Sequence, residues 1–280
     1  MVFRFRADGD LVTDAPPTRR IMPFIMPRRN ESLVFFDIDV DAAAVDARLA
    51  AWRARGIGAS VMHIVAIAAV RVLHERPRLN RFVAGGRHWQ RRGIWVSFSG
   101  KKRKTDDAPV VAIKREIAPE LSDEAIVAAL DGAVQEVRAS TKNHVDKELD
   151  VLLALPTFAL SWVVRVLLLA DHWGLLPRVF IDGDPLYASI FIANLGSLGM
   201  DAAQHHLYEY GTIPLFCVIG KKKTAVALDA TGQVVGREVY PLRFTFDERV
   251  EDGLYCLGAL TRLKALIETD GAVDATKTAT

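Results

Sequence analysis

The sequence predicts an α+β fold, an α/β two-layer sandwich in which helices pack against one mixed sheet. Short stretches rich in β-branched and aromatic residues alternate with longer apolar segments of helical period along most of the 280 residues. Half of the residues are hydrophobic and a quarter are charged, as in a globular protein with a sizeable core. No internal repeat or long linker divides the sequence. We therefore expect one domain, residues 21–269, between an N-terminal arm, residues 1–20, and a disordered tail, residues 270–280.

The arm and the first strand are predicted from short local signals. Pro16 and Pro17 should end any regular structure in the arm, because proline lacks the backbone N–H that a helix interior or a sheet needs. The β-branched and aromatic residues at 32–40 are typical of a strand.

Two helices should follow this strand. Asp41 can cap the first helix and Gly56 can end it. Ser60 can cap the second helix and Pro77 can end it. The second helix is apolar on most sides, which predicts that it is buried.

The rest of the chain alternates between strands and helices. The predicted strands are near 89–90 and at 93–99, 109–113, 187–193, 215–219, 224–228, 234–240 and 242–246, and the predicted helices are 123–140 and 254–269. Ser122 can cap the first of these helices. The turn at 229–232 favours a hairpin between the strands on either side of it.

The segment 149–176 is unusually apolar. Pro156 breaks any single long helix, and Arg165 and Asp171 interrupt the apolar run, so a membrane-spanning helix is not expected. A helix buried in the core or at an interface and a helix lying on a membrane surface both remain open.

The composition narrows the class of protein further. The formal net charge is +2, and the basic runs are not interleaved with aromatic residues, so we expect no nucleic-acid partner. Cys217 and Cys256 lie in apolar stretches without metal-ligand spacing, which indicates reduced core thiols and no metal site. The first residues lack the apolar core of a signal peptide, so we expect a cytoplasmic protein.

Four blocks in the same order resemble one family of enzymes. The sequence resembles the acyltransferases that include chloramphenicol acetyltransferase and the catalytic domain of dihydrolipoamide acyltransferases, the central component of 2-oxo acid dehydrogenase complexes. The blocks that carry the resemblance are Arg76-Pro-Arg-Leu-Asn80, Tyr187-Ala-Ser-Ile-Phe-Ile-Ala-Asn-Leu-Gly-Ser-Leu-Gly199, Leu215-Phe-Cys-Val-Ile-Gly220 and Asp247-Glu-Arg-Val-Glu-Asp-Gly253. The resemblance runs from about residue 20 to residue 268 and implies a chloramphenicol acetyltransferase-like mixed sheet with packed helices.

The resemblance also implies a site chemistry and an assembly. In the family a His removes the proton from a thiol or hydroxyl acceptor, which attacks an acyl thioester, and a Ser or Thr stabilises the oxyanion. The site lies between subunits of a trimer, so a homotrimer is expected. Here Glu248 stands in the place of the His, and Ala193 stands in the place of the oxyanion Ser. Asn194, which follows it, is a further candidate for the catalytic site. Glu248 is interpreted either as an altered catalytic base or as an interface residue without a role in acyl transfer.

The supporting residues of the family site are largely present. Asp252 and Gly253 match the end of the family motif, and Arg28 is the expected partner of Asp252 in an ion pair. His205 and His206 are further candidates, with three open readings: a metal site, for which a third ligand is missing, a substitute general base, and packing or interface hydrogen bonds.

Coenzyme A is the cofactor that the resemblance implies. The basic runs 101–104 and 221–223 could hold its phosphates or could be solvated loop charges. Lys147 is not expected to be a lipoyl attachment site, because it lacks the sequence that surrounds one.

Two functions follow as hypotheses. The first is a stand-alone acyltransferase that uses a coenzyme A thioester and a small-molecule or thiol acceptor. The second is a non-catalytic assembly or regulatory subunit, a pseudoenzyme with the same fold.

Overall fold

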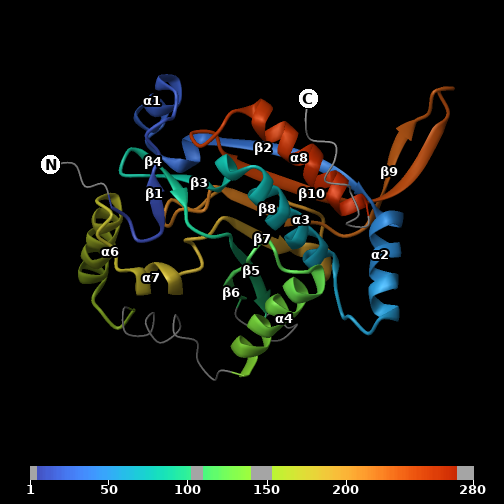
Figure 1. The fold of residues 1–280 in the computed structure, drawn as a ribbon, viewed down its shortest axis with the longest axis horizontal. Helices are drawn as coiled ribbons and strands as arrows, with labels where there is room; N and C mark the ends of the chain where they lie inside the picture. The colour runs from blue at the N-terminus through green and yellow to red at the C-terminus, as the bar shows by residue number, and fades with distance from the viewer. Residues whose placement is uncertain (1–4, 102–109, 140–152, 270–280) are drawn as a thin grey trace.

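A mixed sheet forms the centre of the protein, as predicted (Figure 1). The structure is a computed structural model that describes residues 5–101, 110–139 and 153–269. Neighbouring strands of the sheet follow the order β2 (Leu33–Asp41), β10 (Val234–Asp247), β8 (Leu215–Ile219), β7 (Ile190–Asn194), β5 (Trp95–Lys101) and β6 (Val110–Glu116), and β9 (Lys223–Leu228) pairs with the first part of β10. Strand β7 runs parallel to β5 and to β8, and the other pairs are antiparallel.

Helices cover one face of this sheet. They are α2 (Ala42–Ala54), α3 (Val61–Glu75), α4 (Asp123–Ala139) and α8 (Gly253–Glu268). The main hydrophobic core lies between them and the sheet, with α3 at its centre, since ten residues of α3 are buried. A smaller apolar cluster around Phe191 and Phe216 lies beside β7 and β8. The prediction of an α+β two-layer fold with a buried second helix is therefore confirmed.

The predicted helix boundaries rest on the expected caps. The Asp41 carboxylate accepts hydrogen bonds from the N–H groups of Ala43 and Ala44 at the start of α2. Ser60 and His63 form a reciprocal capping box at the start of α3, in which His63 takes the place usual for Glu or Gln. Both predictions are confirmed.

The N-terminal arm is more ordered than the sequence suggested. Pro17 starts helix α1 (Pro17–Ile25) instead of ending regular structure, because the first position of a helix needs no N–H. Ahead of it, β1 (Gly9–Leu11) joins β4 (Arg87–Arg91) and β3 (Arg81–Ala84) in a second, three-stranded sheet. The expected boundary at residue 20 therefore falls inside helix α1. The tail 270–280 lies outside the described residues.

Strand β10 is continuous where two strands were predicted. Pro241 lies inside it, at the point where the neighbour on one side changes from β9, which pairs as far as Val239, to β8, which pairs from Leu242. The missing N–H of Pro241 therefore falls between two ladders, and the strand passes through.

The apolar segment is not buried in the core. Its described part, residues 153–176, contains α6 (Thr157–His172), none of whose residues is buried, and α7 (Arg178–Gly183) follows it. Helix α6 lies at the side of the molecule, beyond the β3–β4 hairpin (Figure 1). Its exposed large apolar side chains include Phe158, Trp162, Val166 and Leu169. Of the three alternatives, the structure excludes a helix buried in the core of one chain, and a helix at an interface or on a membrane surface stays a prediction. Among the described helices, none is long and apolar enough to cross a membrane.

Candidate functional site

The turn that carries the acyltransferase-like motif is held by a buried ion pair. The Arg249 guanidinium donates to both carboxylate oxygens of Asp247, with Nε–Oδ1 at 2.8 Å and Nη2–Oδ2 at 2.7 Å. Both residues are 4% exposed. A bidentate arginine–carboxylate pair with this geometry fixes the direction in which the chain leaves β10.

Residues from distant segments complete the support of this turn. The Ser32 hydroxyl donates to Asp247, and the Arg29 guanidinium lies 4.0 Å from the same carboxylate. Arg29 is buried, and burial lowers its pKa while Asp247 opposes that shift. The His88 ring, from β4, lies 2.8 Å through Nε2 from the Arg249 carbonyl oxygen. The turn is thus held by contacts with η1 (Arg29–Ser32) and β4 and by the ion pair within the turn.

Glu248 points out of this rigid turn. Its backbone N–H donates to the Ser32 carbonyl at 2.8 Å, and its carbonyl accepts from Arg19 at 2.6 Å. Its carboxylate is exposed, and no hydrogen bond or ion pair holds it within the described part of the chain. A fixed backbone with a free side chain presents this carboxylate to whatever lies outside the subunit.

The predicted ion pair between Arg28 and Asp252 is wrong. The Asp252 carboxylate accepts from the Tyr255 N–H at 2.9 Å and caps α8, while Arg28 is exposed. The backbone hydrogen bond lowers the pKa of Asp252, and Arg19 adds to the shift. The arginine that acts on this end of the motif is Arg19 of α1, nine positions before the one expected.

Gly253 starts α8 in a conformation open to any residue. A Cβ added there would meet no atom of the chain within 4 Å. The fold of one subunit therefore places no steric demand for glycine at this position.

The position of the missing oxyanion donor lies at the end of β7. Ala193 is partly buried and packs on the apolar cluster around Phe191 and Phe216. Asn194 caps the short helix η3 (Leu195–Leu198) through its side-chain oxygen, which accepts from the Ser197 N–H at 3.1 Å. Asn194 therefore shapes the strand end, and the methyl group of Ala193 offers no hydrogen bond.

Strand register separates Ala193 from Glu248 within one chain. Ala193 pairs with Val218 of β8, which pairs with Arg243 of β10. Glu248 lies five positions after Arg243, which corresponds to roughly 15 Å along the strand direction, in addition to two strand spacings across the sheet. One subunit alone does not bring the two positions together.

The two candidate histidines are stacked. The ring centroids of His205 and His206 are 4.9 Å apart, and the His205 ring stacks on Phe216 at 4.1 Å. Desolvation by burial lowers the pKa of His205, whose Nδ1 lies 2.6 Å from the His206 carbonyl oxygen. The His205 carbonyl accepts from the Thr245 hydroxyl and so joins the pair to β10. Within the described ranges, no group of three His, Cys, Asp or Glu side chains is arranged to hold a metal ion.

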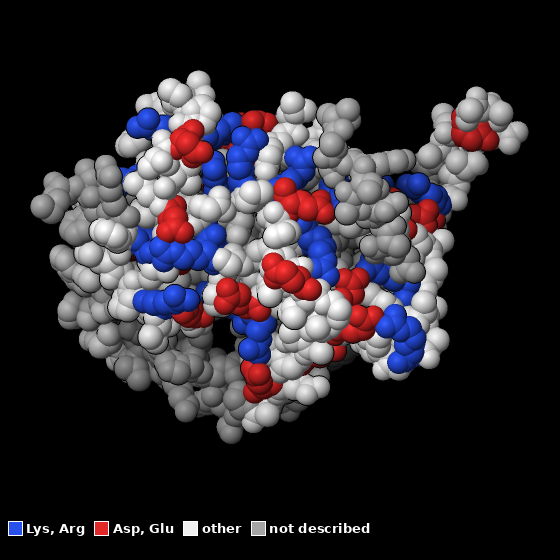
Figure 2. All heavy atoms as spheres, in the orientation of Figure 1, with Lys and Arg blue, Asp and Glu red and all other residues white. Residues whose placement is uncertain are grey.

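The basic run at 221–223 is only partly available to an anion. Lys222 is paired with Asp46 at 2.9 Å, which raises its pKa. Lys221 and Lys223 make no ion pair with the described residues. Residues 102–104 of the other run and Lys147 lie outside the described residues. On the face drawn in Figure 2, basic and acidic side chains are interspersed.

Sequence reasoning missed the structural roles of several site residues. Asp247 and Arg249 were recognised as matches to the family motif. Two residues separated by one position give no sign in the sequence that their side chains form an ion pair. Arg29 and His88 carry no local signal at all, because only the tertiary fold brings η1 and β4 to the turn.

The comparisons with known proteins agree with the geometry. No protein-family model matches the sequence, and no curated protein matches it significantly. Among solved structures, a probable dihydrolipoamide acetyltransferase from Listeria monocytogenes 4b F2365 is 16% identical, with 97% of this chain and 98% of that chain covered and a TM-score of 0.57. A truncated catalytic core of the 2-oxoacid dehydrogenase multienzyme complex from Thermoplasma acidophilum is 16% identical, with coverages of 94% and 99% and a TM-score of 0.58. A chloramphenicol acetyltransferase is 12% identical, with coverages of 92% and 99% and a TM-score of 0.55. The resemblance expected from the four sequence blocks is thus confirmed at the level of the fold, and this chain has the chloramphenicol acetyltransferase-like fold of dihydrolipoamide acetyltransferase catalytic cores.

Proposed function

We propose that this protein is an acyltransferase that works as a homotrimer and uses a coenzyme A thioester as donor. The acceptor is a thiol or hydroxyl compound. Its sulfur or oxygen forms the new bond to the acyl carbon, the bond from that carbon to the coenzyme A sulfur breaks, and Glu248 passes the proton of the acceptor to the departing thiolate.

The observation that carries this proposal is the way in which the turn presents Glu248. The buried Asp247–Arg249 pair holds the backbone, while the carboxylate between them is exposed. A rigid loop that displays one free acid is suited to positioning it against a substrate. The separation of Glu248 from the end of β7 adds to this, because a site that uses both elements needs a second copy of the chain.

Helix α6 supports assembly. It leaves Trp162 65% and Leu169 58% exposed, and a run of such side chains is a surface that association would cover. A second subunit would remove this apolar surface from water, whereas a lone subunit would leave it in contact with solvent. A cytoplasmic location is part of the same proposal.

A second candidate function is that of a non-catalytic assembly or regulatory subunit. The specific observation that favours it is Ala193, whose methyl group stands in the place of the oxyanion donor. Loss of such a donor typically costs about 10²- to 10³-fold in rate. In this case Glu248 is an interface residue, and the protein acts only by associating with other subunits.

One experiment separates the two candidates. The purified chain is incubated with acetyl-coenzyme A and dihydrolipoamide, and S-acetyl product is quantified by chromatography beside Glu248→Gln and the control Glu31→Gln, which changes another exposed glutamate. Acyl transfer by wild type and by the control, with loss in Glu248→Gln, supports the enzyme. Product no faster than in protein-free buffer for all three supports the non-catalytic subunit.

A further inference from the structure

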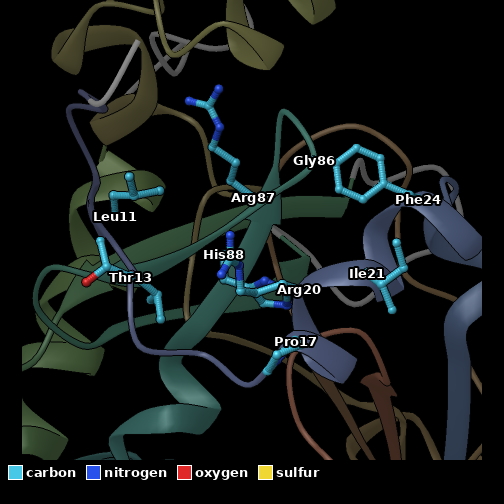
Figure 3. Close-up of a pocket in the computed structure, with 10 residues that line it drawn as sticks. Leu11, Thr13, Pro17, Arg20, Ile21, Phe24, Gly86, Arg87 and His88 are labelled. Carbon is cyan, nitrogen blue, oxygen red and sulfur yellow. The ribbon is translucent and has the colours of Figure 1, made fainter. Parts of the chain in front are cut away.

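A pocket of about 600 Å³ is lined in part by His88, whose ring contacts the motif turn at the Arg249 carbonyl oxygen. It is formed by the segment after β1, by α1 and by the β3–β4 hairpin (Figure 3). Its volume is in the range usual for small-molecule sites. Ile21 and Phe24 of α1 supply apolar side chains on one side of the pocket and Leu11 supplies one on the opposite side (Figure 3). Arg20, Arg87 and His88 supply polar groups.

His88 offers the pocket a hydrogen-bond acceptor. His88 is 4% exposed, and its Nε2 lies 2.8 Å from the Arg249 carbonyl oxygen. A carbonyl oxygen only accepts, so Nε2 carries the proton. Burial lowers the pKa of His88, with Arg19 and Arg81 adding to the shift, while the Arg249 carbonyl and Asp247 oppose it. The ring is therefore neutral near pH 7, and its Nδ1 keeps a lone pair, with no hydrogen-bond partner among the residues that the structure describes.

Arg20 offers the same pocket a cation. It lies on the exposed side of α1, and in Figure 3 its side chain extends from the helix toward the region of His88. No carboxylate of the described chain pairs with it. An unpaired guanidinium beside apolar side chains is a site for a carboxylate.

We propose that this pocket binds a hydroxy carboxylic acid with an apolar tail. The carboxylate lies on the Arg20 guanidinium, the hydroxyl donates to Nδ1 of His88, and the tail lies against Leu11, Ile21 and Phe24. The carboxylate, the hydroxyl and the tail of the ligand thus each contact a different part of the pocket. The proposal does not depend on acyl transfer, because it concerns binding alone.

Binding of matched probes tests the assignment. Isothermal titration compares 2-hydroxyoctanoate with octanoate, which lacks the hydroxyl, and with octan-2-ol, which lacks the carboxylate. We expect 2-hydroxyoctanoate to bind at least about 10-fold more tightly than either, since one hydrogen bond to a buried acceptor or one charged pair is worth about that factor. Equal affinities for the three probes, or no binding of any of them, would overturn the proposal.

Variants assign the two polar groups. Arg20→Gln should weaken both acids about 10-fold and leave octan-2-ol unchanged. His88→Gln keeps a donor for the Arg249 carbonyl and moves the acceptor from the position of Nδ1 to Oε1, so it should reduce the preference for 2-hydroxyoctanoate over octanoate while octanoate still binds. Arg53→Gln, an exposed arginine of α2 outside the pocket, is the control and should bind like wild type. Unchanged acid binding in Arg20→Gln would show adsorption to other apolar surfaces and reject the site, as would an unchanged preference in His88→Gln.

Discussion

Asp247 and Arg249 face each other across Glu248 and form a buried bidentate ion pair, with the two N–O distances at 2.8 and 2.7 Å. The motif positions that match the acyltransferase family are therefore the ones that build the turn. Within this turn, the position that departs from the family, Glu248, is the exposed one. The scaffold of the site and its chemistry are separable in this chain, and each can be tested by itself.

The buried Asp247–Arg249 ion pair predicts that substitution of Asp247 lowers the stability of the protein strongly. Asp247→Ala leaves the guanidinium groups of Arg249 and Arg29 buried without a carboxylate. We expect the free energy of unfolding, measured by urea titration, to fall by about 3–5 kcal/mol. Glu248→Gln changes the neighbouring exposed residue and should stay within about 0.5 kcal/mol of wild type. Equal, small effects of both substitutions would show that the pair does not hold the turn.

The lowered pKa of Lys114 predicts that the free energy of unfolding increases as the pH becomes alkaline. Its ammonium donates to the carbonyls of Ile181 and Asp184 and lies 4.6 Å from the Trp95 ring centroid. Burial lowers its pKa from the ordinary 10.5 to about 8. Between these two values the unfolded chain binds the proton that the folded chain has released, so stability rises with pH in this window.

The change is measured against a variant whose charge does not titrate there. Lys114→Arg keeps a cation and its donors, and arginine stays protonated throughout the window. The free energy of unfolding of wild type minus that of Lys114→Arg should increase by up to about 3 kcal/mol between roughly pH 7.5 and pH 10. Parallel stability curves for the two proteins would contradict the lowered pKa.

Local signals predicted most of the sandwich correctly. Asp41 and Ser60 act through backbone groups two or three positions away, so the residues that decide where α2 and α3 begin are contiguous in sequence. The same holds for the hairpin at 229–232, where the Asp229 carboxylate accepts from the Thr231 and Gln233 N–H groups. Pro17 was misread because proline ends a helix from within but begins one at its first position, and only the following residues distinguish the two.

Contacts between distant segments were beyond the reach of these signals. Arg19 is the third residue of α1 and Arg28 lies three residues after its end, and the choice between them depends on how α1 is placed against the motif turn. His88 joins the turn through a backbone carbonyl, an interaction that leaves no trace in residue type. Helix α6 is apolar in sequence whether it faces a core, a second subunit or a membrane, so its exposure could be found only in the structure.

The exposed apolar face of α6 predicts that the subunits associate through this helix and that charged substitutions on it disrupt the association. Wild type should sediment as a species three times the 30.9 kDa mass of the chain in detergent-free buffer. Trp162→Glu combined with Leu169→Glu should shift it toward the single-chain mass, because buried charges would oppose association. Val226→Glu, an exposed apolar residue of β9, is the control. A single-chain species for wild type would contradict the trimer. Binding of wild type to liposomes, lost in the double variant, would indicate a membrane-surface role for this helix.

Restoring the two family groups should raise the activity of the enzyme. Glu248→His combined with Ala193→Ser supplies a base with an ordinary pKa near 6.5 and a hydroxyl donor for the oxyanion. The buried Asp247–Arg249 pair and the Asn194 cap should hold the new side chains in place, since neither is changed. We expect acyl transfer from acetyl-coenzyme A to dihydrolipoamide to increase by about 10²-fold or more, measured by product chromatography.

The single variants and the assembly state decide what this result means. Ala193→Ser alone should give a smaller gain, because the oxyanion donor assists only a step for which a base is in place. A gain in the double variant shows that the two substitutions had weakened a site whose scaffold and substrate access are otherwise intact. No gain in a double variant that still folds and assembles would mean that substrates do not reach this turn, and the non-catalytic function would stand. Loss of activity in Glu248→His, in a protein whose wild type is active, would instead identify the carboxylate itself as the working base, whose pH–rate profile should then rise with its ionisation.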